Sequence, residues 1–320
     1  MQFAHDLFYN VDRFFLISGA ELSTEDMNRL YSERHIPVLL NEVVDNLVWK
    51  PDGVYVDCTV GEGGHTQAIA ERIAASGGKV IGLDVDSEVL QIAERNLEAH
   101  PNVQLFKFSY VELPVLLNLL QVHKVDGLLV DLGVSTYQLK AEGRGFSFNQ
   151  DEPLDMRMNL ENDLTAYDVV NTYPEEKLAD IIYSYGEENF ARRIARSIVQ
   201  SRPIHTTREL VEAIRRALPY KEIHGRKRHF ATKTFQAIRI EVNKELENIT
   251  KFLSFAPDFL SHGGKLAIIS FHSLEDRLVK HAFKDDPRLK PLGDFIAPSL
   301  EEISVNPRSR SAKLRIAERV

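Results

Sequence analysis

The chain has 320 residues, of which 43% are hydrophobic and 27% charged, and its formal net charge is −8 at pH 7. This length exceeds the roughly 100 to 200 residues of one domain, so we expect either one large domain or a core with an inserted second domain. The composition is that of a soluble globular protein, and no apolar run approaches the roughly 18 residues of a membrane span. A membrane partner is therefore not expected.

Cys58 is the only cysteine, which excludes an intramolecular disulfide and a multi-cysteine zinc site. Its place in an apolar run is typical of a buried structural thiol, and we expect a cytoplasmic protein without a metal site. Residues 1–34 form an N-terminal extension in which acids such as Asp6 and Asp12 interrupt the apolar positions, unlike a signal or transit peptide. We expect this extension to pack on the core or on a second subunit, as in a homodimer.

Strand-like and helix-like segments alternate from residue 54 to residue 132, which is typical of a parallel sheet flanked by helices. Apolar spacing predicts helices over 65–75 and 87–98. Strands are predicted over 54–59, 79–84, 103–108 and 125–131. The unit is therefore βαβαβαβ.

A long helical region follows and runs to about residue 260 with few strand signals. Because it is too long for a crossover, we interpret 137–245 as an inserted, mainly helical domain. Gly263 and Gly264 are expected to end a helix and lead into a strand that ends at residue 270. A helix over 273–284 follows, and the alternation over 311–320 predicts an edge strand.

The run Gly61-Glu62-Gly63-Gly64 lies where the first strand must turn and let its backbone approach a ligand. Asp84 closes the second strand, where a carboxylate can accept both ribose hydroxyls of an adenosine group. A nicotinamide dehydrogenase is the alternative, but its G-x-G-x-x-G pattern needs another glycine where Thr66 stands. Together these features favour a nucleoside cofactor.

Charge is distributed unevenly along the chain. Residues 191–239 contain thirteen Lys or Arg against three acids, a local balance of +10 that leaves −18 for the rest. This asymmetry indicates a surface that faces a polyanion, although a solvated basic helix face is the alternative.

Eight separate motifs, in order along residues 35–320, resemble the bacterial ribosomal small-subunit methyltransferase H family, also called MraW. They are His35–Leu40, Gly61–His65, Asp131–Ser135, Arg144–Phe148, Pro153–Met158, Tyr185–Glu188, Thr234–Ile240 and Ser270–Arg277. The chain departs from the family pattern in its longer N-terminal extension and at Phe230, where proline is frequent.

The resemblance implies methyl transfer from S-adenosylmethionine to the exocyclic N4 of a cytidine in 16S ribosomal RNA, at the decoding centre. It also implies an α/β fold, a Rossmann-like class I methyltransferase sheet built from residues 35–136 and 246–320 around the helical insert. The cofactor contacts that it implies fall on Gly63, Gly64, His65, Asp84, Tyr110, Asp131 and Gln138. Tyr110 stands where many members have Phe, so only its ring contact is carried over.

Three residues are candidates for catalysis. Asp131 ends the fourth strand, on the sheet edge where α/β proteins bind ligands, and is expected to help place the amine; a simple strand-end cap is the alternative. Asp155 and His272, with Arg157, are expected to hold the base or a phosphate. The alternatives are a structural ion pair of Asp155 with Arg157 and a helix-capping or core role for His272.

The basic stretch is the candidate platform for 16S ribosomal RNA or the small ribosomal subunit. Its candidate RNA contacts, beside Arg157, are Arg192, Arg193, Arg196, Arg226, Lys227 and Arg228. Methylation of another RNA or DNA base, methylation of a small molecule, and cofactor binding without transfer are the competing functions.

Overall fold

The computed structural model describes residues 36–320, which form one compact unit; the N-terminal extension and the expectations attached to it lie outside these residues. A seven-stranded sheet runs through this unit in the order β3-β2-β1-β4-β5-β7-β6. In chain order its strands are β1 (Val54–Asp57), β2 (Lys79–Asp84), β3 (Val103–Lys107), β4 (Val125–Asp131), β5 (Leu260–Ser270), β6 (Leu289–Pro291) and β7 (Lys313–Arg319). The first five are parallel, and β7 is antiparallel to both β5 and β6.

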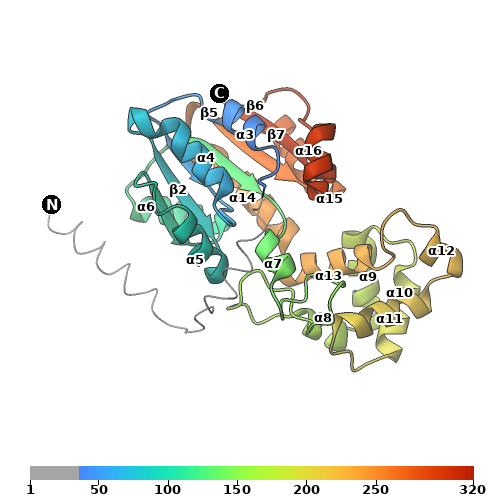
Figure 1. Ribbon diagram of the computed structural model, residues 1–320. Helices are drawn as coiled ribbons and strands as arrows, with labels where there is room; N and C mark the ends of the chain where they lie inside the picture. The colour runs from blue at the N-terminus through green and yellow to red at the C-terminus, as the bar shows by residue number, and fades with distance from the viewer. Residues whose placement is uncertain (1–35) are drawn as a thin grey trace. The chain divides into compact units, whose positions relative to one another are not determined.

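Successive residues of the central strands point to opposite faces of the sheet, and each face has its own apolar core. Tyr55, Leu129 and Ile269 pack on one face against α3 (Leu40–Leu47) and α4 (Gly64–Ile73). Val56, Leu128 and Ile268 pack on the other face against α6 (Leu113–Leu119), α14 (Glu245–Phe259) and α15 (Ser273–Asp285). This three-layer arrangement is the Rossmann-like α/β class that the sequence predicts (Figure 1). Cys58 is buried, as predicted.

The predicted elements of the first half are observed with small shifts at their ends. The helix predicted over 87–98 is α5 (Ser87–Asn96), and the one predicted over 65–75 is α4 followed by the 3-10 turn η1 (Ala74–Ser76). Asp86 ends the turn before α5 and accepts a hydrogen bond from the N–H of Glu88, so it caps that helix.

Two predictions about the second half of the sheet are wrong. Strand β7 is not an edge strand, because the short β6 pairs on its far side and forms the edge. Gly263 and Gly264 do not end a helix either: α14 ends at Phe259, and both glycines lie within β5, where its register against β4 shifts. A register shift of this kind is a common use of glycine in a strand.

Seven helices lie between β4 and α14: α7 (Thr136–Lys140), α8 (Ala166–Thr172), α9 (Glu175–Gly186), α10 (Ala191–Gln200), α11 (Thr207–Ala217), α12 (Tyr220–His224) and α13 (Thr232–Asn243). Buried residues of α8, α9, α10, α11 and α13 form an apolar core of their own. Figure 1 shows these helices gathered apart from the sheet. This separate core supports an inserted domain. Its bounds at 137–245 stay a prediction. Among residues 36–320, no helix is both long and apolar enough to cross a membrane.

Candidate active site

The turn after β1 is shaped by glycine and held by Asp84. Gly61 and Gly63 have φ values of +56° and +94°, a region that L side chains rarely adopt, and the N–H of Gly61 donates to Asp84 Oδ2 at 3.0 Å. A Cβ on Gly64 would lie 2.2 Å from Cγ of Pro37. Gly64 therefore allows Pro37 to pack closely against the start of α4.

Asp84 ends β2 beside this turn, and its second oxygen accepts the N–H of Asp86 at 3.0 Å. Burial raises the pKa of Asp84 to about 6, although the two backbone N–H groups lower it. Burial likewise raises the pKa of Asp57, at the end of β1, to about 6. Two carboxyl groups with raised pKa values thus lie at the carboxyl ends of neighbouring strands, where α/β sheets bind ligands.

Two other residues predicted to contact the cofactor have polar partners within the chain. Nε2 of His65 lies 2.9 Å from the carbonyl oxygen of Val38, and burial lowers the pKa of this imidazole to about 4, so it is neutral at pH 7. Gln138 donates to Asp86 Oδ2 at 2.8 Å and accepts the N–H of Ser135 at 3.0 Å. The amide of Gln138 is therefore used mainly to cap α7 and to hold Asp86.

Tyr110 lies in the 3-10 turn η2 (Tyr110–Glu112) after β3, and its ring meets Phe252 of α14 edge to face at 5.5 Å. Burial raises the pKa of its phenol, and the charges of Glu245 and Glu275 raise it further. The ring is thus held between the sheet and α14, beside acidic groups that come from distant parts of the chain.

Asp131 ends β4, next to β1, and its backbone N–H donates to Thr59 Oγ1 at 2.6 Å. Its Oδ2 lies 3.9 Å from Nδ1 of His65, whereas its buried Oδ1 has no hydrogen-bond partner among the described residues. Burial raises the pKa of Asp131 well above its ordinary value, and the charges of Asp57 and Glu275 add to this effect. The strand end is therefore poised to accept a hydrogen bond or a proton from a ligand.

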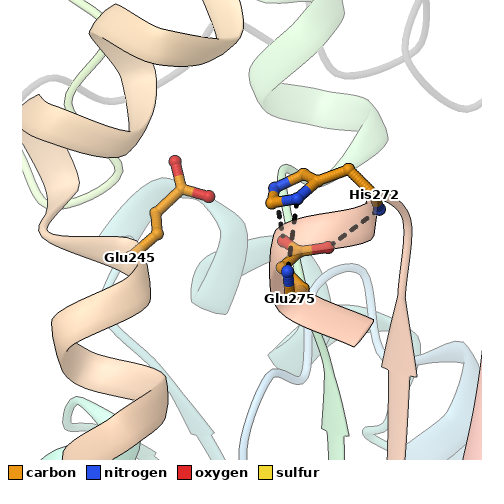
Figure 2. A group of neighbouring side chains, drawn as sticks. All are labelled: Glu245, His272 and Glu275. Atoms are coloured by element: carbon orange, nitrogen blue, oxygen red, sulfur yellow. Dashed lines mark hydrogen bonds and ion pairs between the residues drawn. The ribbon is translucent and has the colours of Figure 1, made fainter. Parts of the chain in front are cut away.

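His272 follows β5 and caps α15, which is one of the roles that the sequence left open for it. Its Nδ1 accepts the N–H of Glu275 at 3.4 Å, and Oε2 of Glu275 accepts the N–H groups of His272 and Phe271. Figure 2 shows the imidazole ring and the Glu275 carboxylate facing each other, with Glu245 of α14 pointing toward them. Sequence reasoning did not assign Glu275, although a glutamate three residues after an N-cap is a signal for such a partner.

Arg239 and Glu245 form a second polar pair that sequence reasoning missed. Nε and Nη2 of Arg239 donate to the two oxygens of Glu245, each at 2.8 Å. They lie on α13 and at the first turn of α14, where the helical region returns to the sheet. No local pattern marks a pair that depends on this junction.

Asp155 and Arg157 form an ion pair with each other. Nε and Nη2 of Arg157 donate to Asp155 at 3.0 and 2.7 Å, and its Nη1 donates to the carbonyl oxygens of Leu160 and Asn162. This is the structural ion pair that the sequence left open as the alternative. The roles of Asp155 in catalysis and of Arg157 in RNA binding stay predictions.

A cavity of about 850 Å³ lies between the helical region and the sheet. Arg226, Lys227 and Arg228 line it from one side, and His272 lines it from the other. Arg226 also pairs with Glu188, which is 1% exposed, and with Glu222. The predicted RNA contacts on α10 are exposed but do not line this cavity: Arg192, Arg193 and Arg196.

The cavity is also lined by three cations that sequence reasoning did not single out, Lys233, Arg310 and Lys313, and by the rings of Phe190, Phe271 and Phe295. Three acids line it as well: Glu187, Glu188 and Glu222. Positive side chains interleaved with aromatic rings suit a single-stranded polyanion that carries bases. The charge excess of 191–239 indicated one side of this cavity, whereas the side formed by 310–313 belongs to a second basic stretch near the C-terminal end of the sequence, which the sequence reasoning did not single out.

Known proteins are similar to this chain over most of its length. A family model described as the MraW methylase family matches residues 32–320. The protein called ribosomal RNA small subunit methyltransferase H from Fervidobacterium nodosum is 82% identical over 92% of this chain and 100% of its own length. Its namesake from Thermosipho africanus is 67% identical over 91% and 100%. A solved SAM-dependent O-methyltransferase from Thermotoga maritima aligns with 93% of this chain and 72% of its own at 12% identity and a TM-score of 0.43, too low to add to this match.

Proposed function

The chain belongs to the MraW methylase family, and on that premise we propose that it methylates the exocyclic N4 of a cytidine in 16S ribosomal RNA, at the decoding centre. Membership confirms the resemblance that the eight motifs indicate, and with it a methyltransferase that depends on S-adenosylmethionine. The observation that best supports the substrate is the basic cavity, because it opens beside His272 at the edge of the sheet that carries Asp84 and Asp131.

The residues proposed to hold the cofactor are Gly63, Gly64, His65, Asp84, Tyr110, Asp131 and Gln138. The positive φ of Gly63 fits a turn whose backbone can approach a nucleoside, whereas the space that a Cβ on Gly64 would fill is taken by Pro37. Asp84 is the acceptor for ribose hydroxyls. Gln138 fits this role least well, since its amide already has two protein partners. When bound, S-adenosylmethionine supplies an electrophilic methyl group on a sulfonium.

The cytidine amine is a weak nucleophile because its lone pair is conjugated with the ring, so positioning supplies much of the rate. Asp131 is proposed to accept a hydrogen bond from this amine and to take its proton late in the reaction, through the unpartnered Oδ1. His272, at the cavity wall, is proposed to hold the base. Asp155 and Arg157 are weaker candidates for contacts with the base, because their charged groups already form an ion pair with each other.

The helical insert is proposed to bind the RNA, with the target base unstacked so that it reaches the methyl group. Arg226 supports this less directly than Lys227 and Arg228, since two glutamates hold its guanidinium. The protein is proposed to act in the cytoplasm, on 16S RNA or the small ribosomal subunit. A homodimer also remains a proposal.

The test is mass mapping of modified nucleosides in 16S RNA from cells with and without this protein. N4-methylcytidine is expected to disappear from one position of the decoding centre when the protein is absent and to return when purified protein and S-adenosylmethionine are added to small subunits. If a different base lacked its methyl group in cells without the protein, or if the methyl group were transferred to DNA, the proposed substrate would be wrong.

A further inference from the structure

Three buried side-chain atoms at the carboxyl ends of β4 and β5 have no hydrogen-bond partner among the described residues: Asp131 Oδ1, His272 Nε2 and Glu275 Oε1. Most buried polar atoms in folded proteins are paired, and an unpaired one costs free energy that a ligand recovers by pairing with it. The three lie at neighbouring strand ends: Asp131 of β4 pairs with Ile269 of β5, three residues before His272, and His272 contacts Glu275 at 3.1 Å.

The bonds already made decide what each atom offers. Nδ1 of His272 accepts the N–H of Glu275, which leaves the proton of a neutral imidazole on Nε2 as a donor. Oε2 of Glu275 accepts two backbone N–H groups, which leaves Oε1 as an acceptor. Oε1 lies 3.1 Å from His272 Nε2, close enough for the ion pair drawn in Figure 2, but the pair does not have hydrogen-bond geometry, so each atom can still serve a ligand.

Glu275 is kept ionised, so both of its oxygens are acceptors. Burial alone would raise its pKa, but contact with His272 and the charge of Arg239 bring the pKa below its ordinary value. Oδ1 of Asp131 is the second acceptor. The site therefore presents two acceptors and one donor to a ligand.

A cytosine base presents the complement of this set. Its exocyclic N4 carries two hydrogens, and the neighbouring N3 is an acceptor. Uracil reverses both features, because its O4 is an acceptor and its N3 carries a hydrogen. Two carboxylate oxygens facing O4 would have no hydrogen to accept, which is the arrangement that sites use to reject a wrong base.

We propose that Asp131, His272 and Glu275 form a subsite that reads the Watson–Crick edge of cytosine. Oδ1 of Asp131 and Oε1 of Glu275 accept the two N4 hydrogens, and Nε2–H of His272 donates to N3. This inference rests on the proposed function and deepens it by assigning Glu275 and the choice of cytosine over uracil. In the transfer, a bond forms between N4 and the methyl carbon as the carbon–sulfur bond breaks, sulfur keeps the electron pair, and the N4 proton passes to Asp131.

A divalent cation is the competing occupant, since Glu245, His272 and Glu275 bring possible ligand atoms within 4.8 Å of one another (Figure 2). The bonds of this cluster disfavour it. Both oxygens of Glu245 accept from the Arg239 guanidinium, which would repel the cation, and His272 Nε2 would have to lose its proton. A base that carries hydrogens needs neither change.

Glu275→Gln tests the subsite with little disturbance of the helix cap, because the glutamine oxygen can still accept the two backbone N–H groups while its NH2 replaces Oε1. The measurement is the affinity, with S-adenosylhomocysteine bound, for 16S RNA that carries either cytidine or uridine at the target position. We expect the unaltered protein to prefer cytidine by about 10-fold or more, and Glu275→Gln to bring this ratio close to 1.

Glu209→Gln is the matched control, since Glu209 closes the equivalent capping box of α11, and it is expected to keep the full preference. His272→Asn keeps a capping oxygen but removes Nε2, so it too should lower the preference, and it decides the question if Glu275→Gln fails to fold. An unchanged preference in a folded variant overturns the subsite. A preference that rises with added Mg²⁺ or Zn²⁺ and falls with EDTA supports the cation instead. If the unaltered protein methylates no cytidine in 16S RNA, the proposed function fails, and the base preference is a separate result.

Discussion

The two halves of the site differ in how their polar groups are satisfied. At the ends of β1 and β2, the oxygens of Asp57 and Asp84 already accept hydrogen bonds from backbone N–H groups and from Thr66. At the ends of β4 and β5, one atom each of Asp131, His272 and Glu275 is buried without a partner. The protein itself therefore provides partners for the oxygens of the first half, whereas the second half keeps unpaired atoms for the base that we propose it binds.

The sharpest way to break this comparison is Asp131→Asn, which keeps the shape of the side chain and removes its charge. We expect the rate of methyl transfer at saturating substrate to fall by about 10²- to 10⁴-fold, because the acceptor for the N4 proton is lost. Cofactor affinity measured by calorimetry should change far less. Intact transfer with unchanged cofactor affinity would remove Asp131 from the mechanism.

Asp84→Asn addresses the cofactor half. Loss of the carboxylate should weaken S-adenosylmethionine binding by about 10- to 100-fold, since bonds from a ligand to a charged acceptor contribute about 1.5–3 kcal/mol. Glu71→Gln, on the exposed face of α4, is the control for this measurement.

The pH dependence follows from the same carboxyl groups. Asp57 and Asp84 have pKa values raised from 3.8 to about 6, so the folded state binds their protons more tightly than the unfolded state does. Their contribution to the stability of the unliganded protein is fully present below about pH 4 and is lost as the pH rises through about 6. Cofactor affinity should run the other way and weaken below about pH 6, where Asp84 is protonated. Titration of Tm and cofactor affinity from pH 5 to 8 would reveal these opposite trends.

The basic face of α10 gives a smaller effect that is specific to RNA. Changing its three exposed arginines to glutamine should lower the salt dependence of binding to small subunits by a log–log slope of about 2, at about 0.7 for each phosphate contact. The residues are Arg192, Arg193 and Arg196. Three exposed cations of the sheet-bearing part provide the control: Lys79, Arg95 and Lys284. If both triple variants lost the same slope, the overall positive charge of the protein, and not the face of α10, would account for RNA binding.

The smallest effect is expected from Asp155→Asn. The variant weakens a partly exposed ion pair with Arg157 worth about 1 kcal/mol or less, so Tm should fall by about 1–4 °C. Methyl transfer should stay within about two-fold of the unaltered protein. A loss comparable with that of Asp131→Asn would instead give Asp155 the catalytic role.

The sequence predicted the first four strands closely, because fully buried parallel strands appear as short apolar runs between helical patterns. The strand order after β5 depends on contacts that no local pattern records. The three-residue β6 is too short to be recognised, yet it converts β7 from an edge strand into an interior one. Likewise, Gly263 and Gly264 carry the same signal whether they end a helix or bend a strand.

The same limit applies to the site. Gly63, Gly64 and Asp84 were predictable because turn, helix and strand end follow one another within a single βαβ unit. Glu275, Arg239 and Glu245 come together only after the helical region returns to the sheet, and Lys313 reaches the cavity from the last strand. Residues that act across such junctions need the fold before they can be assigned.

The position of β7 has a consequence for the order in which the fold can form. This strand follows all the other strands in the described chain, yet it lies between β5 and β6, and its Arg315 donates to Asp276 of α15, next to Glu275. Until residues 313–319 pair with β5, that strand has an open edge and α15 lacks this anchor. The glycine turn between β1 and α4 depends on contacts that are near in sequence, whereas the position of His272 and Glu275 depends on a strand about forty residues further along the chain.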